Sequence, residues 1–182
     1  MRRTIIANVW FCSDLHISHK NIANFRKEVT SETHNREVIK YFWDKQVTKR
    51  DLVWVLGDAA FDEDAIDWIG TLNGEKRLIR GNHDLCPTSS YLRTFSEVYG
   101  LVRYKGMWLS HAPVHPDELR GKNSLHGHTH YQNMKFLGIN DECQPIYIDD
   151  PRYLNCSVEN LMRNWGSPLI SLDQVRSYFK SD

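Results

Sequence analysis

The sequence predicts an α/β fold built as a single domain over residues 1–182. In the first half, short apolar runs rich in β-favouring residues alternate with amphipathic helical patterns, and each run ends at polar residues. The length of 182 residues suits about one domain. Hydrophobic residues make up 41% and charged residues 25%, which are ordinary globular values and exclude a disordered chain.

The strands and helices of the first half follow from hydrophobic patterning. Four apolar runs are predicted as strands, over residues 8–12, 51–56, 76–79 and 107–109. Two amphipathic segments are predicted as helices, over residues 36–47 and 62–72. Ligand groups in such a core lie in loops beyond the carboxyl ends of the strands.

The second half has a different pattern. Lys105 and Gly106 form a predicted turn between two β-like runs within 99–110. Further strands are predicted over 124–130, 144–149 and 153–159, with no long helix among them. This half therefore predicts a mixed sheet, or two packed sheets.

The charge balance limits the partners of the protein. Twenty-three Lys and Arg residues balance twenty-three Asp and Glu residues, so we expect no strong affinity for nucleic acid and none for an anionic membrane. No apolar run approaches the roughly 20 residues of a membrane span, and a signal-peptide pattern is missing at the start. We expect a cytoplasmic protein with four reduced cysteines.

Five short polar motifs follow the predicted strands. In order along the chain, they are Asp14-Leu15-His16, Gly57-Asp58, Gly81-Asn82-His83-Asp84, His111, and Gly127-His128-Thr129-His130. Each motif alone has an ordinary explanation as a capping residue or a turn. If the last motif continues a strand, its period of two places His128 and His130 on one face.

Together the motifs offer carboxylates, a carboxamide and imidazoles, with no thiolate among them. This mixture suits Mn, Fe, Zn or Ni better than Ca or Mg alone. Seven candidate ligands exceed the needs of one ion with open positions, so two metal ions sharing a carboxylate are expected. Such a pair acidifies a bridging water and clamps an in-line displacement at phosphorus.

The five motifs, intact and in this order, resemble those of the calcineurin-like metallophosphoesterases. The resemblance implies a four-layer αββα sandwich, in which two mixed β-sheets are flanked by helices. The opening segment from Phe11 to Ile22 and the late segment Ile170-Ser171-Leu172-Asp173 are similar, more narrowly, to the small single-domain phosphoesterases of bacteria and their phages.

The resemblance also implies a ligand set. Asp14, His16 and His130 bind the first metal, Asn82, His111 and His128 bind the second, and Asp58 bridges both. Two divalent ions are expected, Mn²⁺ first, with Ni²⁺, Zn²⁺ and Fe²⁺/Fe³⁺ as alternatives. The nucleophile is then a bridging hydroxide rather than a side chain.

His83 and Asp84 are the expected catalytic residues. His83 follows a ligand, and we expect it to protonate the leaving-group oxygen while Asp84 orients its ring or raises its pKa. His83 as a simple hydrogen-bond donor to phosphate is the alternative.

Three further residues are candidates for substrate binding: His19, Arg36 and Arg80. His19 could equally be an ordinary loop histidine, and Arg80 could pair with a nearby acid instead of a phosphate. His34, His115 and His126 are interpreted as surface or packing residues, with support of the neighbouring metal ligands as an alternative for His126.

The sequence therefore predicts a metal-dependent phosphoesterase acting on a small phosphate ester, with a nucleotide as one candidate. A chain without an inserted cap leaves an open site, which favours phosphodiesters over monoesters. Two alternatives remain, namely a catalytically silent binding or scaffold protein on the same fold and a protein phosphatase. The oligomeric state stays open.

Overall fold

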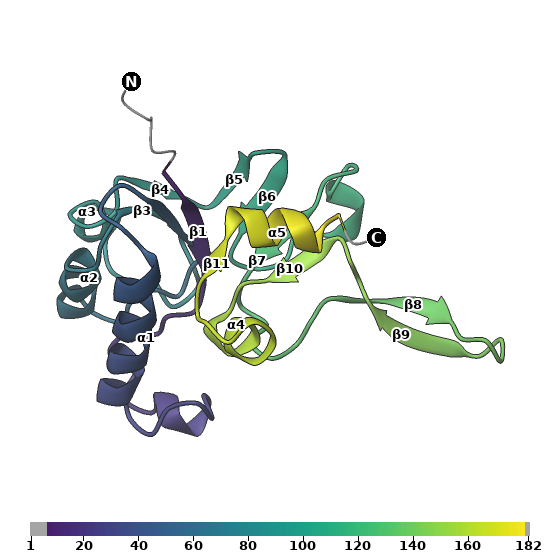
Figure 1. Cartoon of the computed structure of the whole chain (residues 1–182), viewed down its shortest axis with the longest axis horizontal. Helices are drawn as coiled ribbons and strands as arrows, with labels where there is room; N and C mark the ends of the chain where they lie inside the picture. The colour runs from purple at the N-terminus through teal and green to yellow at the C-terminus, as the bar shows by residue number, and fades with distance from the viewer. Residues whose placement is uncertain (1–6, 181–182) are drawn as a thin grey trace.

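A computed structural model describes residues 7–180 and contains two central β-sheets (Figure 1). The first sheet has the strand order β11 (Ile170–Ser171), β1 (Val9–Cys12), β2 (Leu52–Val55), β3 (Glu75–Ile79) and β4 (Glu97–Tyr99). The strands β1 to β4 pair in parallel, and β11 joins β1 antiparallel. The carboxyl ends of β1, β2 and β3 therefore lie along one edge.

The second sheet is also mixed. Its strand order is β10 (Tyr153–Asn155), β7 (Ser124–His126), β6 (Met107–Ser110) and β5 (Leu101–Tyr104). Here β7 pairs in parallel with β6 and β10, and β5 pairs antiparallel with β6. A separate two-stranded hairpin, β8 (Lys135–Ile139) with β9 (Pro145–Asp149), projects from the body of the domain (Figure 1).

Helices complete the layers. The first half supplies η1 (Ile22–Asn24), α1 (Glu32–Gln46), α2 (Glu63–Gly70) and α3 (Thr88–Tyr91). The second half supplies η2 (Pro116–Glu118), α4 (Val158–Trp165) and α5 (Leu172–Tyr178). Ser31 and Asp62 cap α1 and α2 by accepting hydrogen bonds from backbone N–H groups of the first turn, which fixes where each helix begins.

Two hydrophobic clusters hold the layers together. One lies between the first sheet and the helices, where Trp43 of α1 and Ile66 of α2 pack with strand residues such as Val53. The other joins the two sheets, where Trp54 packs in one cluster with Leu109. Alternate residues of β2 thus face opposite clusters, as the period of two in a strand buried on both faces requires.

The expected mixed sheets with flanking helices are confirmed, and so are the strands and helices expected in the first half. One expectation for the second half is wrong. The run 153–159 is not one strand, because β10 ends at Asn155 and α4 starts at Val158. No long helix was expected there, and the two helices that do form, α4 and α5, are short, with eight and seven residues.

Helices α4 and α5 give weak sequence signals because both are short. The apolar stripe of α4 is only Val158, Leu161, Met162 and Trp165, which is about two turns. Helix α5 starts at a capping box in which Ser171 and Gln174 satisfy each other's backbone N–H groups. Both signals are weaker than that of a helix of ordinary length.

Within residues 7–180, no helix is long and apolar enough to cross a membrane. The four cysteines are free, with Cys12 and Cys156 buried and Cys143 exposed. Burial raises the pKa of both buried thiols, which keeps them protonated.

Candidate metal centre

The seven expected ligands all lie just beyond strands whose carboxyl ends converge. Strand β1 leads to Asp14 and His16, β2 to Asp58, β3 to Asn82, β6 to His111, and β7 to His128 and His130. The first three strands are neighbours in one sheet and the last two are neighbours in the other. The site is therefore formed where the edges of both sheets meet, at the position favoured for ligands in parallel sheets.

The backbone at these positions is unusual. Five of the seven residues have positive φ angles: Asp14 at 57°, His16 at 51°, Asp58 at 50°, His128 at 68° and His130 at 50°. Each such left-handed conformation costs about 1–3 kcal/mol in a residue other than glycine. The strain is offset by main-chain pairing, for example the bonds from the N–H groups of Asp14 and His16 to the loop after β2, at 2.9 and 3.0 Å.

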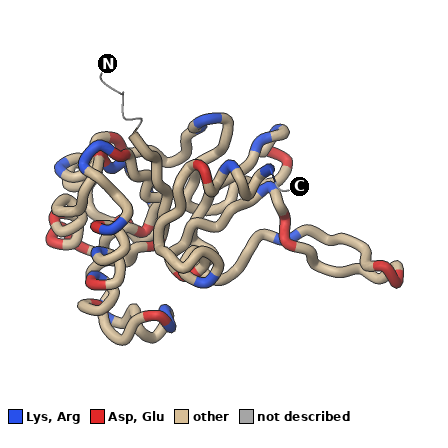
Figure 2. Tube along the Cα trace, in the orientation of Figure 1, with Lys and Arg blue, Asp and Glu red and all other residues tan. Residues whose placement is uncertain are grey.

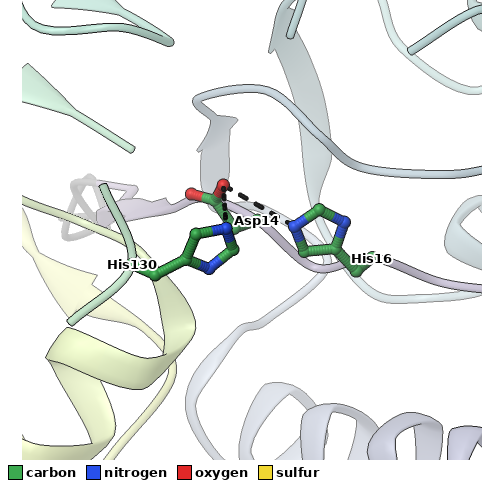
Figure 3. Close-up of side chains that lie close together, drawn as sticks. All are labelled: Asp14, His16 and His130. Atoms are coloured by element: carbon green, nitrogen blue, oxygen red, sulfur yellow. Dashed lines mark ion pairs between the residues drawn. The ribbon is translucent and has the colours of Figure 1, made fainter. Parts of the chain in front are cut away.

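Asp14, His16 and His130 form one group. Oδ1 of Asp14 lies 3.8 Å from Nε2 of His16 and 3.9 Å from Nε2 of His130. The two imidazole rings stack with centroids 5.3 Å apart, so that both nitrogens face the same carboxylate (Figure 3). The three ligand atoms lie within 4.8 Å of one another.

Asn82, His111 and His128 form a second group beside Asp58. Oδ1 of Asn82 lies 2.9 Å from Nε2 of His111 and 3.0 Å from Nδ1 of His128. Oδ2 of Asp58 lies 3.3 Å from Nε2 of His111 and 3.9 Å from Nε2 of His16. Asp58 thus contacts one histidine of each group.

The donor set fits metal ions by two observations. His16 is buried, yet neither of its ring nitrogens makes a hydrogen bond, a state that is rare for buried polar atoms unless another ligand is bound. The Nδ1 of His111 lies 2.9 Å from the carbonyl of Leu56, which leaves its Nε2 lone pair directed at Asp58. Carboxylate, amide and imidazole atoms without thiolates suit first-row divalent ions.

Comparison with known families agrees with this geometry. The profile of the calcineurin-like phosphoesterases matches residues 7–160, which include both groups of ligands. The chain belongs to the calcineurin-like phosphoesterase family. The family is one of phosphoesterases that use divalent metals in a dinuclear centre, which supports metal-dependent phosphoesterase chemistry in general terms.

Small proteins are among its relatives. The gene 66 protein of Mycobacterium phage L5 is 32% identical over 162 residues, covering 69% of this chain and 78% of its own. An uncharacterised protein of Methanocaldococcus jannaschii is 30% identical over 160 residues, covering 83% of this chain and 81% of its own. The gene 66 protein of Mycobacterium phage D29 is 43% identical over 84 residues, which is 43% of this chain and 41% of that protein.

One solved structure shares the fold. A protein of unknown function from Aquifex aeolicus superposes with a TM-score of 0.67 at 25% identity, covering 94% of this phosphoesterase and 98% of that protein.

The electrostatics of the phosphoesterase site favour a cation. Burial opposes protonation of His111, but the Asp58 and Asp14 carboxylates outweigh it and raise the pKa of the ring. Burial by itself disfavours the charged form of Asp58, but hydrogen bonds and the charge of His111 lower its pKa to about 2. Burial raises the pKa of Asp14, whose charge a metal ion would stabilise. A metal cation between the carboxylates of Asp14 and Asp58 would therefore be stabilised by them.

A buried ion pair supports His130 from behind. Nδ1 of His130 lies 3.3 Å from Oε2 of Glu159, whose other oxygen accepts a bond of 2.9 Å from Nε of Arg26. The Arg26 guanidinium also donates to the carbonyl of Asp14. Burial would raise the pKa of Glu159, but Arg26 and His130 lower it to about 2. Sequence reasoning missed both residues of this pair, which 133 positions separate.

Asp84 has partners different from those expected. Its buried carboxylate accepts four backbone hydrogen bonds, from the N–H groups of Asp58 at 2.9 Å, Ala59 at 2.9 Å, Ala60 at 3.3 Å and Gly81 at 2.8 Å. Both oxygens are therefore occupied by the loops after β2 and β3. Asp84 ties these two loops together, and none of these four hydrogen bonds goes to the His83 ring.

The His83 ring lies on the side of the first group. Its centroid is 5.8 Å from that of His16, and it stacks on Phe61 at 5.4 Å. Phe61 also contacts His19 and His16, with centroids 4.8 and 5.6 Å apart. Phe61 thus packs against three histidines, and nothing in its local sequence marked it.

Two hollows flank the ligands. One, of about 450 Å³, is lined by His16, His19, Ile22, Phe25, His83, His130 and Tyr131. The other, of about 600 Å³, lies beside the second group and is lined by Asn82, His111 and His128 together with apolar residues that include Leu101, Trp108 and Val114. The two groups of ligands therefore border separate hollows.

The two arginines have structural partners. Arg36 donates to Glu32 and Ser18, lies over the Trp68 ring, and lines neither hollow. Its role at the substrate stays a prediction. Arg80 does line the larger hollow. Its guanidinium, however, donates to three groups in the segment 84–88, at 2.6 to 2.9 Å.

Two of the histidines assigned to surface or packing lie in such places. His115 is exposed, and His126 is fully buried with its Nδ1 2.8 Å from the carbonyl of Gly127. The expectation that His128 and His130 share one face of a strand is wrong, because β7 ends at His126. Positive φ angles at both histidines direct one ring to each group of ligands.

Gly81 and Gly127 allow the loops to approach closely. A Cβ atom on Gly81 would lie 3.0 Å from Cγ of Asp58, and its nearer contacts would be with the oxygen and backbone nitrogen of that residue. A Cβ on Gly127 would lie 2.6 Å from Cβ of Ser13 and closer still to the Asp14 carboxylate. Any larger residue would displace a ligand.

Proposed function

We propose that the protein hydrolyses small phosphodiesters, with lower activity on monoesters. The observation that carries this proposal is the pair of hollows on either side of the ligand groups. A monoester has one organic substituent on phosphorus and needs one hollow. A diester has two substituents, and a hollow on each side gives both a place.

The ligand sets follow the two groups. Asp14, His16 and His130 hold one ion, Asn82, His111 and His128 hold the other, and Asp58 contacts both, with Mn²⁺ as the native metal. When bound, the ions supply an acidified water and polarise the phosphoryl oxygens.

His83 is proposed as the general acid. Its ring borders the smaller hollow beside His16, and its backbone N–H donates to Oδ1 of Asp58 at 2.8 Å. That bond fixes the loop so that the ring faces the hollow. His19, which lines the same hollow and has a buried Nδ1 without a hydrogen-bond partner, is proposed to donate to the phosphate group.

Small substrates are favoured over polymers. Over residues 7–180, basic and acidic residues are interspersed along the trace (Figure 2). Long nucleic acids need a basic channel to track the phosphate backbone. A nucleotide diester, with its base in one hollow, matches the apolar lining by Trp108 and Leu101.

The test compares bis(p-nitrophenyl) phosphate with p-nitrophenyl phosphate. Metal-stripped protein is assayed with Mn²⁺, Ni²⁺, Zn²⁺ or Mg²⁺ restored singly. We expect faster diester cleavage, highest with Mn²⁺, loss of activity in Asp58→Ala, and wild-type rates in the surface control Asp44→Ala. No turnover with any metal would support a silent binding protein, and faster monoester cleavage would overturn the diester preference.

A second assay isolates His83. His83→Ala should slow hydrolysis of alkyl diesters by about 10²–10⁴-fold and of p-nitrophenyl esters far less, because a good leaving group needs little protonation. Equal losses on both substrates, with metal binding intact, would assign His83 to phosphate binding instead.

A further inference from the structure

The β8–β9 hairpin stands apart from the domain. Its strands pair from Lys135 with Asp149 to Ile139 with Pro145, and the ribbon projects into solvent (Figure 1). At about 3.4 Å per residue, each five-residue strand spans about 17 Å. An isolated two-stranded hairpin is marginally stable in water and is normally stabilised by packing on one face.

Both faces of this hairpin are apolar. Because side chains alternate along a strand, Phe136, Ile146 and Ile148 lie on one face, while Leu137, Ile139 and Tyr147 lie on the other. These side chains are 42%, 38% and 38% exposed on the first face and 65%, 72% and 74% exposed on the second. An ordinary surface hairpin would present polar residues on one face.

The apolar surface is concentrated here. Among the described residues, six of the eleven large hydrophobic side chains that are exposed belong to this hairpin. Their exposed area is about 700 Å² over both faces of one copy, and the face of Leu137, Ile139 and Tyr147 supplies about two thirds of it. Packing that face alone contributes less than the roughly 800 Å² per partner of a standard interface, so the contact is a small one. A patch of this size on an isolated ribbon marks an interaction surface.

Charge distinguishes the two ends of the hairpin. The turn carries Asp141 and Glu142, both exposed. At the base, a polar hollow of about 510 Å³ is lined by two cations, Lys135 and Arg163, and one anion, Asp149, which lies 3.9 Å from Lys135, so the base carries a small excess of positive charge. Figure 2 shows the acidic turn at the far end of the ribbon. An acidic tip is repelled by anionic lipid, which makes a membrane surface a poor partner.

We propose that this hairpin is a dimerisation arm that packs against the same hairpin of a second copy. A two-fold axis brings identical patches together, with the two ribbons antiparallel. Because the arms are equal in length, the acidic tip of each copy then reaches the basic base of the other. One arrangement thus buries apolar side chains and brings opposite charges together.

The test is the molar mass in solution, by light scattering after size exclusion and by sedimentation equilibrium. We expect about twice the chain mass of 21.4 kDa at micromolar concentrations. The triple variant Leu137→Thr/Ile139→Thr/Tyr147→Thr should be monomeric and fully folded by circular dichroism, because these side chains are solvent-exposed in one copy and Thr suits strands. The control Tyr41→Gln/Leu92→Gln removes side chains that are 60% and 54% exposed elsewhere and should stay dimeric.

Charge reversal tests the antiparallel arrangement. Asp141→Lys/Glu142→Lys should raise the dimer dissociation constant at least about tenfold, and adding Lys135→Glu/Arg163→Glu should restore it. A monomeric wild-type protein, a dimeric triple variant, or a wild-type protein that stays monomeric but sediments with anionic vesicles would each overturn the proposal. None of these outcomes depends on catalysis.

Discussion

Replacing Asp84 by Asn tests how the metal loops are held. The carboxylate accepts two backbone N–H groups on each oxygen, from Asp58 and Gly81 on one and from Ala59 and Ala60 on the other. An amide NH₂ in either position would face two buried donors. Each donor left unsatisfied costs about 1–3 kcal/mol, and relief from burying a charge offsets part of this, so we expect a net loss of about 3 kcal/mol.

This loss has measurable consequences. In a chain of this length, 1 kcal/mol shifts the melting temperature by about 2–4 °C, so Asp84→Asn should melt about 9 °C lower. Displaced loops should also weaken Mn²⁺ binding about 10–100-fold in isothermal titration.

The matched control is Asp67→Asn, which removes an exposed partner of Arg93 and should melt within about 2 °C of wild type. The structural role would be refuted if Asp84→Asn kept wild-type stability and metal affinity but slowed alkyl diesters more than p-nitrophenyl esters, as His83→Ala is expected to do. That result would support the expected action of Asp84 on His83.

Two further predictions concern buried carboxylates. Glu159→Gln should weaken Mn²⁺ binding about 10–100-fold, because Glu159 lies 3.3 Å from Nδ1 of His130 and orients that ring. The exposed control Glu63→Gln should bind Mn²⁺ like wild type. Unchanged affinity in Glu159→Gln would contradict the orienting role of Glu159. Burial by itself would raise the pKa of Asp51, but N–H groups of Thr48 and Asn8 outweigh it and lower that pKa below 3.8. Its contribution to stability is therefore present above pH 3.8 and lost as the pH falls through the folded-state pKa. Urea denaturation should show Asp51→Asn about 2 kcal/mol less stable at pH 7, with the gap closing as the pH falls through the folded-state pKa. A gap that does not change with pH would refute this assignment.

The parts of the fold and the site that depend on local patterns could be predicted from the sequence. Asp14, Asp58 and Asn82 each follow a clear apolar strand, and parallel strands place their carboxyl ends together. The mixed sheets of the second half were also foreseeable from short β-like runs.

The remaining features depend on long-range contacts or on backbone conformation. The Arg26–Glu159 pair joins residues 133 positions apart, and no local pattern links them. The separation of His128 from His130 depends on two left-handed residues rather than on strand alternation. Asp84 bonds to backbone N–H groups, which carry no sequence signature.

The arginines show a similar limit. The position of Arg80 beside a ligand loop was predicted, but its guanidinium bonds to the segment that follows that loop. Arg36 supports Ser18 in the loop after β1. A cation near a predicted anion site can therefore hold the loops instead of the ligand.

The most direct test of the two-metal centre is the number of Mn²⁺ ions that metal-stripped protein binds. Equilibrium dialysis with elemental analysis should give about two ions per chain, and electron paramagnetic resonance should show a spin-coupled pair. His128→Ala should retain about one ion, in the group around Asp14 and His16. Binding of a single uncoupled ion, or of none, by the wild-type protein would contradict the dinuclear centre.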